Sequence, residues 1–578
     1  MADPKKEDTE NGSSDSKIVH RGAKVIPLII GNETFEKLGT IGSSANLLVY
    51  FVTVFNLKSS TATNLVNILN GSTNLATLPA AFLTDTYFGR YNVLAMASIA
   101  SFLGMLVLTL TAATPALHPQ HCISISCQGP SPWQLIFLLG GLILLIIGGG
   151  GIRPCNLAFG IDQFDPKDES SKAGIVSFFN WYYLGFTIAI MVAATVIVYV
   201  QSNVSWGLGL GIPTGLMFLS CLLFFSGSKM YVRVKPVGSP FVSVVQVIVS
   251  ALKKRHLILS DESNLLVLDT VDEKSSYSRL PHTNQFRFLE KAAMITEEDE
   301  LNIGGTAVKP WELCSIEQVE QVKCLMRIIP IWVSGTIYYV FLVTLMQNNV
   351  VFQAQQSNRH VRGTTFQIPS GSFFAFSMLA ITFFVPLYDR LIVPAISKIT
   401  KRESGITPLQ RIGFGMIVSI PTLLLAGIVE KKRRTMALAS GSFTSPMSWV
   451  WLVPQMVLGG LSDAFAIIGL FEFYYNEVPD NMKSLGGSFY CCGMAMASYL
   501  TSFIVTMVHK ATTGSRTGNW LPDDLNKGRL DYYYYFIAAM ELVNLVYFLA
   551  CAKSYKYKGS WDGMDNKGDD RKAEIIMI

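Results

Sequence analysis

Three ionisable side chains stand in an otherwise apolar stretch near the start of the chain. The segment GNETFEKLGTIGSS, residues 31–44, contains Glu33, Glu36 and Lys37. Positions i, i+3 and i+4 share one face of a helix, so we expect these groups to lie side by side. Burial favours the neutral form of a carboxyl group, whereas a neighbouring cation favours the charged form. The spacing therefore predicts a site that can bind and release a proton.

The pairing within this trio decides which carboxylate is free to exchange. Lys37 can pair with Glu33 one turn earlier, which leaves Glu36 as the candidate for protonation. A helix over residues 25–57 is about 50 Å long and places Glu33 about 12 Å from its start. The alternative is a satisfied ion pair near an interface with no functional role. The depth favours function, because ionisable residues inside a membrane are expensive and rarely incidental.

A basic residue follows a run of four glycines in GGGGIRPCN, residues 148–156. The glycines allow a close helix approach or a bend, and Pro154 removes a backbone donor just after Arg153. We interpret this segment as a hinge that carries the Arg153 charge into a cavity. The alternative is that Arg153 extends towards the membrane edge at the end of its span.

Four more ionisable residues fall within or at the start of later apolar segments: Lys323, Asp463, Glu472 and Glu541. Asp463 needs a cationic partner at this depth, and Arg153 or Lys323 is the expected one. We treat Lys323, Asp463 and Glu472 as candidates for substrate binding or gating. Glu541 has no assigned partner.

Histidine and cysteine offer little to this chemistry. All seven histidines lie in tails, loops or at the end of an apolar segment, so a proton relay would have to use carboxylates. The nine cysteines show no metal-ligand spacing, and we predict no metal site. Cys122 and Cys127 share one polar loop and could form a disulfide on an oxidising side; two free thiols are the equal alternative.

Aromatic residues next to polar ones could line a substrate cavity. They occur in FFNWYY (178–183), at 338–339 and in FEFYY (471–475), although packing explains most aromatics in membranes. The candidates for contact with a substrate are Asn180, Tyr183, Trp332 and Tyr338.

The elements that would position these residues are membrane helices. Of 578 residues, 50% are hydrophobic and only 15% charged, and residues 173–228 contain no Asp, Glu, Lys or Arg. About 20 apolar residues suffice to span a bilayer. We therefore predict an all-α polytopic membrane protein with twelve spans, at about 25–57, 59–84, 91–115, 133–155, 173–200, 205–227, 324–350, 366–388, 408–429, 447–475, 484–508 and 532–552.

The spans divide into six, a charged linker and six more, the layout of transporters that work by alternating access. Lys and Arg in the first loops predict that both termini and the linker are cytoplasmic. EKKRR (430–434) departs from this pattern. The linker contains PFVSVVQVIVSALKKRH (240–256), which we expect to form an amphipathic helix. The predicted parts are a tail (1–24), a bundle (25–227), the linker (228–320), a second bundle (321–553) and a tail (554–578).

A weak repeat supports two related halves. DTYFGRY (85–91) and YDRLIVP (388–394) each place an Asp–Arg pair after the second span of a half. We predict a shared conformational role for Asp85, Gly89, Arg90, Asp389 and Arg390, against the alternative of ordinary interfacial charge.

Several motifs together resemble one known family. ETFEK, DTYFGRY, GGGGIRPCNLAFGIDQFD, SFFNWYY and EQVKCLMRIIPIW are similar, in order, to signatures of proton-coupled oligopeptide transporters and of their plant nitrate/peptide branch. Within that branch, GNETFEKLGTIG and NWLPDDLNKGRLDYYYY resemble the importers of glucosinolates and related glucosides. The resemblance implies the major facilitator fold, with two rocking six-helix bundles.

By this resemblance Glu33, Glu36 and Lys37 form the proton-coupling motif, and Arg153 and Lys323 are the basic residues of the fourth and seventh helices. By the same resemblance, Asp463 stands where relatives usually have Glu. Lys37 stands where many relatives have Arg; lysine keeps the charge but lacks the planar guanidinium group. The histidine used for nitrate in the dual-affinity nitrate transporter is absent; Leu342 falls near its place.

The resemblance and the residues lead to one expectation: a proton-coupled symporter that imports a small organic solute, an anionic or glucosylated plant metabolite. Nitrate or di- and tripeptide symport is the alternative. A membrane transferase is disfavoured because no catalytic cluster is found, and a channel fits deep paired charges poorly. We expect no cofactor beyond the proton gradient, no nucleic-acid partner, a monomer in the lipid bilayer, and the plasma membrane or, alternatively, the vacuolar membrane.

Overall fold

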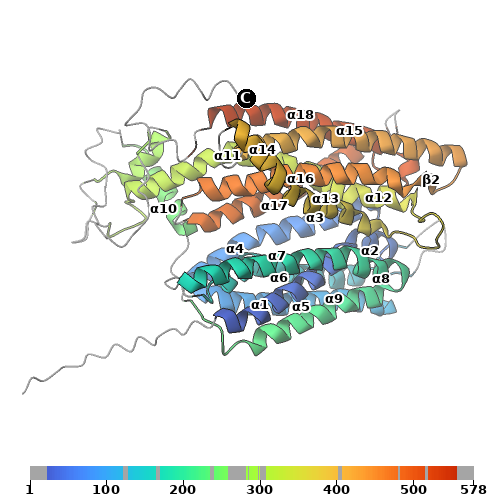
Figure 1. Ribbon diagram of the computed structural model, residues 1–578, viewed down its shortest axis with the longest axis horizontal. Helices are drawn as coiled ribbons and strands as arrows, with labels where there is room; N and C mark the ends of the chain where they lie inside the picture. The colour runs from blue at the N-terminus through green and yellow to red at the C-terminus, as the bar shows by residue number, and fades with distance from the viewer. Residues whose placement is uncertain are drawn as a thin grey trace, which may run out of the picture.

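The structure is a computed structural model that describes residues 22–120, 128–164, 169–234, 240–257, 282–283, 285–296, 299, 307–400, 406–479, 482–514, 518–555 and 557. The described chain is almost entirely helical (Figure 1). Cys122 and Cys127 lie outside the described residues, so their disulfide stays a prediction.

The first half contains α1 (Gly22–Ser44), α2 (Leu47–Thr53), α3 (Ser59–Leu75), α4 (Thr77–Leu83), α5 (Gly89–Ala113), α6 (Pro132–Ile161), α7 (Glu169–Val192), α8 (Val198–Asn203) and α9 (Trp206–Ser226). The linker contains α10 (Pro240–Lys253) and the 3₁₀ turn η5 (Arg287–Ala293). The second half contains α11 (Ile316–Leu342), α12 (Val350–Gln355), β1 (Ser357–Asn358), α13 (Phe374–Leu387), α14 (Val393–Thr400), α15 (Pro408–Ser440), β2 (Ser445–Ser448), α16 (Val453–Glu477), α17 (Lys483–Thr512) and α18 (Leu530–Ser554).

Ten segments of the described chain are long and apolar enough to cross a membrane. One of them, Ser59–Ala113, has 55 residues and changes direction at Gly89, so it holds two of the predicted spans. The helix pair α1–α2 is not among the ten, since α1 carries three charges within its apolar stretch. With these two adjustments the described helices account for twelve spans, and the all-α membrane class is confirmed.

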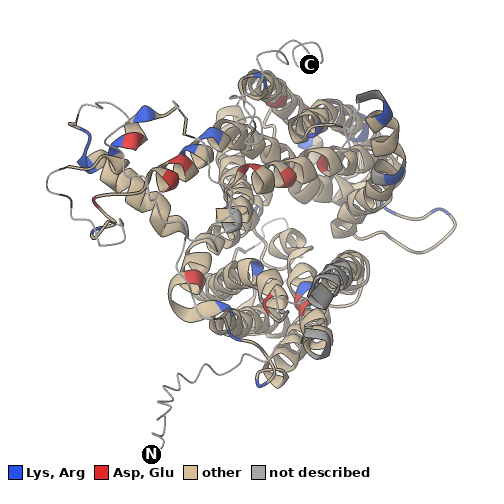
Figure 2. Ribbon diagram, turned by 60° about the vertical axis from the view of Figure 1, so that its left-hand side comes forward, with Lys and Arg blue, Asp and Glu red and all other residues tan. Residues whose placement is uncertain are grey.

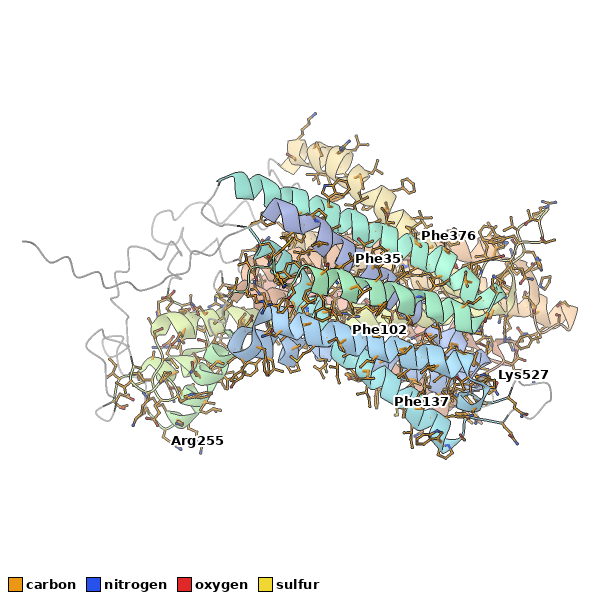
Figure 3. The ribbon with its side chains drawn as sticks, turned by 90° about the horizontal axis from the view of Figure 1, so that it is seen from below. Phe35, Phe102, Phe137, Arg255, Phe376 and Lys527 are labelled. Carbon is orange, nitrogen blue, oxygen red and sulfur yellow. The ribbon has the colours of Figure 1, made fainter. Side chains whose placement is uncertain are left out.

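The helices gather into two bundles with the linker at one end (Figure 1). In the first bundle α5 packs on α6 and α9, and α1 packs on α9 and α7. In the second, α15 packs on α16 and α18, and α11 packs on α17 and α18. Helices α3 and α17 form the main contact between bundles. Arg255 marks the linker end of the molecule and Lys527 the far end (Figure 3).

The four glycines of α6 form a packing seam on two sides of the helix. A Cβ added at Gly148 would lie 2.6 Å from the Ser101 backbone nitrogen on α5. A Cβ at Gly150 would lie 2.6 Å from Ala76 Cβ beside α3. The run therefore lets both neighbours approach the α6 backbone, and it positions Arg153 two residues later.

The repeat between halves appears as a matched distortion. The second span of the first half ends in a π-helical turn, η1 (Thr84–Phe88), and the second span of the other half ends in another, η8 (Tyr388–Ile392). Gly89 follows η1 with φ +72°, a conformation that favours glycine. The two predicted Asp–Arg motifs thus coincide with π turns, which are frequent at functional sites.

The linker folds into a small module on the start of α11. Helix α10 packs against η5 and α11 around a shared apolar core made of Val247, Ala251, Leu289, Ala292, Ala293, Cys314, Val319 and Val322. The predicted amphipathic helix is therefore present, with this apolar face covered by the linker itself. Burial alone would raise the pKa of Asp299, but hydrogen bonds from Lys254 and Thr296 lower it below its ordinary value. Figure 2 shows many of the charged segments in this module.

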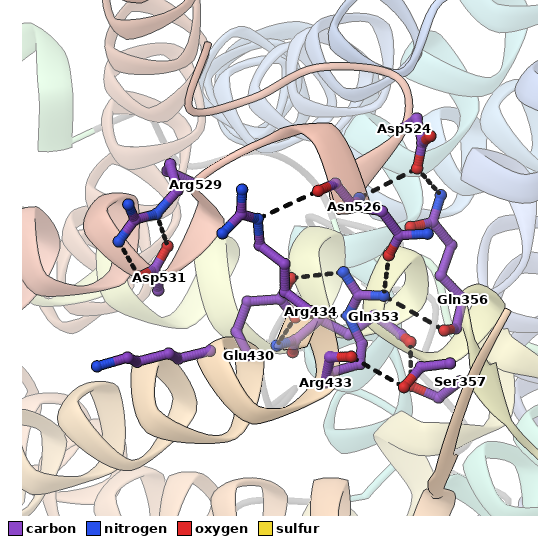
Figure 4. A network of polar contacts seen from close by, with 12 residues as sticks. Gln353, Gln356, Ser357, Glu430, Arg433, Arg434, Asp524, Asn526, Arg529 and Asp531 are labelled. Carbon is purple, nitrogen blue, oxygen red and sulfur yellow. Dashed lines mark hydrogen bonds and ion pairs between the residues drawn. The ribbon is translucent and has the colours of Figure 1, made fainter. Parts of the chain in front are cut away.

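A buried ion pair holds the far end of the second bundle together (Figure 4). Glu430 and Arg433, both 0% exposed, form two hydrogen bonds of 2.8 and 2.9 Å. Gln353 donates to Glu430 over 3.0 Å, and Arg433 donates to Asn526 over 2.9 Å. Breaking such a pair by removing one partner typically costs about 3–5 kcal/mol. The EKKRR segment thus has a structural role at this end, which accounts for part of its unexpected charge.

The seam can be tested by adding bulk to two glycines of the same helix. Gly148→Leu should destabilise the protein by about 1–3 kcal/mol or more, because its side chain meets backbone atoms that cannot move aside. Gly140→Leu is the matched control, since a Cβ there meets nothing within 4 Å. Thermal unfolding in detergent measures both; equal melting temperatures would contradict the packing described.

Candidate proton and substrate site

Glu33, Glu36 and Lys37 lie together on α1, and the two carboxylates are almost fully enclosed. Glu33 is 1% exposed and Glu36 is 3% exposed. The Lys37 Nζ atom lies 2.8 Å from Glu36 Oε2 and 3.4 Å from Glu33 Oε1. Two carboxylates thus share one ammonium group, and this arrangement carries one negative charge too many unless a proton or another cation balances it.

The closer pairing differs from the expected one. Lys37 lies nearer to Glu36, and the Thr40 hydroxyl also donates to Glu36 over 2.7 Å. Glu33 has the longer contact with Lys37, and the Tyr182 side chain also interacts with it. The expectation that Glu36 would be the less compensated carboxylate is therefore not met in this structure, because the i, i+1 contact is shorter than the i, i+4 contact. Glu33 takes that place.

Arg153 extends from α6 into the region between the bundles. It donates a hydrogen bond to Asn74 at the end of α3, and its side chain is exposed. Its charge also acts on Lys37, and on Tyr490 and Cys491 of α17 in the other bundle. The glycine run therefore delivers a cation to a position that both bundles can reach.

Asp463 lies on α16, 5% exposed, in contact with a tyrosine rather than a cation. Its Oδ1 atom is 3.0 Å from the Tyr338 hydroxyl. The expected pairing with Arg153 or Lys323 is not formed in this structure, in which the three residues are all described. Tyr490 of α17 lies near both Asp463 and Arg153.

Lys323 lies apart from this group, at the linker end of α11. Its side chain is 0% exposed, and Nζ lies 2.7 Å from both Glu290 and Glu320 and 2.8 Å from the Thr283 carbonyl. Because Glu290 and Thr283 belong to the linker, Lys323 fastens the linker module to α11. A role of Lys323 in gating stays a prediction. In this geometry Lys323 would act through the linker.

The remaining candidates occupy varied settings. Glu472 is 39% exposed and pairs with Arg411 of α15 over 3.4 Å. Trp332 donates to the Phe489 carbonyl of α17 over 2.8 Å, so its indole nitrogen is already engaged. Asn180 and Tyr183 belong to α7, but their side chains lie outside the described part, and their contact with a substrate stays a prediction.

The first Asp–Arg motif makes an ion pair at the linker end. Arg90 pairs with Asp162 at the end of α6, and Asp85 lies close enough to interact with both. In the second motif Arg390 is exposed, and the side chain of Asp389 lies outside the described residues. The first motif thus ties α5 to α6, and its conformational role stays a prediction.

A row of hydrogen bonds, most of them between uncharged groups, joins the two bundles along α3. From the far end inwards the pairs are Ser59 with Asp523 (2.7 Å), Asn64 with Thr506 (3.0 Å) and Ser502 (2.8 Å), Asn67 with Asn348 (3.0 Å), Asn70 with Gln347 (3.4 Å) and Ser72 with Tyr499 (2.8 Å). Tyr199 and Phe366 also stack across the halves, with centroids 5.5 Å apart. These contacts close the far half of the interface between the bundles.

Sequence reasoning missed the α3 row and the partners Thr40 and Asn74. A signal for the row was present, because Asn64, Asn67 and Asn74 recur at helical spacing in an otherwise apolar span. No signal pointed to their partners, since Ser502 and Asn348 lie hundreds of residues away.

Comparison with known proteins gives the class of this fold and site. Residues 91–521, more than half of the chain, match the family model PTR2, described as the POT family. The chain belongs to this family of membrane transporters. Protein NRT1/PTR FAMILY 2.9 of Arabidopsis thaliana is 51% identical over 94% of both chains, and Protein NRT1/PTR FAMILY 2.11 of the same plant is 50% identical over 97% of this chain and 92% of its own.

Solved structures agree on the fold. An auto-inhibited POT family peptide transporter matches with a TM-score of 0.67 at 19% identity, covering 92% of this chain and 97% of its own. The POT family transporter PepTSo matches with a TM-score of 0.66 at 19% identity, covering 92% and 98%. The major facilitator fold is therefore confirmed. The homologues and structural neighbours are transporters and not enzymes, as expected.

If the hydrogen bonds along α3 hold the far end closed, removing some of them should favour the open state. Asn64→Leu removes two hydrogen bonds worth about 1 kcal/mol each, and so should shift the closed-to-open ratio about 5–30-fold towards opening. Electron–electron distance measurements between spin labels at positions 58 and 510, in a cysteine-free background, would report the longer distance.

The control variant is Asn92→Leu, since Asn92 is exposed and, among the described residues, its side chain donates to the Phe88 carbonyl four residues earlier and not to the other bundle. An Asn64→Leu distance distribution that matches the wild type would contradict the closing role of the row.

Proposed function

We propose that the protein is a proton-coupled symporter in which Glu33, Glu36 and Lys37 carry the coupled proton. The observation that supports this most directly is the sharing of one ammonium group by two enclosed carboxylates, with Lys37 at 2.8 Å from Glu36 and 3.4 Å from Glu33. A proton on one carboxylate removes the excess charge in a low-dielectric site. Glu33, with the longer ion pair, is the better candidate for that proton.

Arg153 connects the proton site to the rest of the pathway. Its charge acts on Lys37, and it is exposed beside α17 of the second bundle. An anionic substrate that reaches Arg153 would draw the guanidinium away from Asn74 and change the balance of charge around the trio. We infer that Arg153 pairs with Asp463 in the other conformation of the transporter, so that this ion pair forms and breaks as the bundles rock.

The substrate that we propose is an anionic or glucosylated plant metabolite of the glucosinolate kind, moved into the cytosol. The exposed Arg153 favours an anion, and the amide and hydroxyl groups along α3 suit the hydroxyls of a sugar. Leu342 is 6% exposed and provides no hydrogen-bonding group for nitrate. The plasma membrane is the proposed location, with the vacuolar membrane as the alternative and both termini on the cytoplasmic side.

Nitrate or peptide symport is the second candidate. It is favoured by the names of the relatives, which include NRT1/PTR family members, and of structural neighbours described as peptide transporters. Uptake of nitrate, dipeptides and a panel of glucosinolates by oocytes that express the protein separates the two. Uptake of nitrate or dipeptides alone would overturn the proposed substrate class and leave proton coupling untouched.

Neutral substitutions of the trio test the proton role. Glu33→Gln and Glu36→Gln should each abolish accumulation driven by a pH gradient, because neither amide can bind and release a proton. Exchange of labelled for unlabelled solute, which needs no net proton movement, should persist in Glu33→Gln. Both activities are measured in proteoliposomes with a glucosinolate panel.

The control is Glu312→Gln, a linker carboxylate whose side chain is 44% exposed. It should behave like the wild type. Full gradient-driven accumulation by Glu33→Gln and by Glu36→Gln would remove the trio from the coupling mechanism.

A further inference from the structure

The second bundle contains two buried carboxyl groups that have no cationic partner among the described residues. Asp463 on α16 is 5% exposed and Glu541 on α18 is 0% exposed. An ionised carboxylate without a partner is unfavourable at membrane depth. The trio on α1 contains a lysine and lies in the first bundle, so these two acids form a separate region with its own charge balance.

The hydrogen bonds around Asp463 allow the protons to be counted. Ser462 Oγ lies 2.8 Å from the Gly415 carbonyl oxygen, which can only accept. The Tyr338 hydroxyl lies 2.8 Å from Ser462 Oγ and 3.0 Å from Asp463 Oδ1. Three hydrogen bonds therefore require three protons, and the two hydroxyl groups supply one each.

The Gly415 carbonyl group fixes the direction of the hydrogen bonds that connect it to Asp463. Ser462 must donate to Gly415, so its oxygen is left to accept from Tyr338. The single Tyr338 proton is then used, and the contact between Tyr338 and Asp463 is a hydrogen bond only if the carboxyl group donates. An ionised Asp463 would leave one of these buried contacts without a proton.

We propose that Asp463 is a second proton-binding residue, which in this state carries a proton and donates it to the Tyr338 hydroxyl. Tyr338 and Ser462 act as positioning residues, because together they present an acceptor to the acid. The consequence for transport rests on the proposed function. When the bundles rock and Arg153 reaches Asp463, a cation replaces the proton, so the second bundle releases a proton of its own. The cycle still requires the proton of the trio, so this second proton does not by itself drive accumulation in the glutamine variants of the trio.

The other charged groups around this part of α16 leave the proposal unchanged. Tyr338 comes from α11 and Tyr490 from α17, and neither side chain brings a positive charge. On α15, Arg411 is bound to Glu472 and to the Ala464 carbonyl. Glu541, on α18, also acts on Tyr338 but is bound to Asn544 over 3.3 Å.

Infrared spectroscopy of the purified protein in lipid nanodiscs tests the proposal without any substrate. A protonated carboxyl group gives a carbonyl stretching band that vanishes when the group ionises. In wild-type protein, incorporation of ¹³C-labelled aspartate should shift such a band, and Asp463→Asn should remove it. Asp531, the other deeply buried aspartate of the second bundle, pairs with Arg529 and should give no such band.

A second variant tests the positioning role. Ser462→Ala removes the acceptor for Tyr338, whose proton is then free to stabilise an ionised Asp463. The pH midpoint at which the aspartic acid band disappears should therefore fall. A merely structural serine would leave this midpoint where it was. Glu541→Gln is the matched control, because it neutralises a buried acid of the same bundle and should leave the aspartic acid band in place.

Several outcomes would overturn the proposal. They are the absence of any band shifted by labelled aspartate, an unchanged band in a folded Asp463→Asn protein, and a midpoint in Ser462→Ala that stays or rises. If Asp463→Asn fails to fold, the labelled wild type and Ser462→Ala still decide. None of these results bears on the trio, whose failure would appear instead as gradient-driven accumulation by its glutamine variants.

Discussion

Two carboxylates that share one lysine inside α1 set the constraint on which this protein depends. Glu33 and Glu36 are almost completely enclosed, and Lys37 lies within ion-pair distance of both. Charge cannot be left unbalanced in such a place without a large penalty. The protein therefore needs a mobile positive charge near the trio, and a proton or the Arg153 guanidinium can provide it. A transporter can use that requirement to make proton binding and substrate binding depend on each other.

The rest of the structure places these charges where the two bundles can act on them. The glycine seam brings α6 against α5 and α3 and sets Arg153 at the interface. The α3 row closes the far half mainly with amide and hydroxyl groups, which bind each other more weakly than ions would and so can separate during a cycle. The Glu430–Arg433 pair, by contrast, is fully buried and bidentate, and it is joined to Gln353 and Asn526 at the far end of the second bundle.

Much of this arrangement follows from the sequence. Where the sequence did not predict it, there is a physical reason. Apolar length predicted twelve spans, and helical spacing predicted that the trio shares a face. The nearer partner of Lys37 depends on side-chain conformation, and the i, i+1 contact was closer than the i, i+4 contact. The partner of Asp463 depends on how α11 and α16 pack, which spacing alone does not specify. Lys323 was expected near the substrate, yet its partners Glu290 and Glu320 lie at the linker end, because the linker folds back onto α11.

The central claim, that charge balance in the membrane couples a proton to the solute, can be measured directly as current. In oocytes that express the wild-type protein, a glucosinolate should evoke an inward current that grows as the external solution is made more acidic. The reversal potential of that current should move with the proton gradient, because each cycle carries protons with the solute. A solute-evoked flux that is unaffected by the proton gradient would contradict the account.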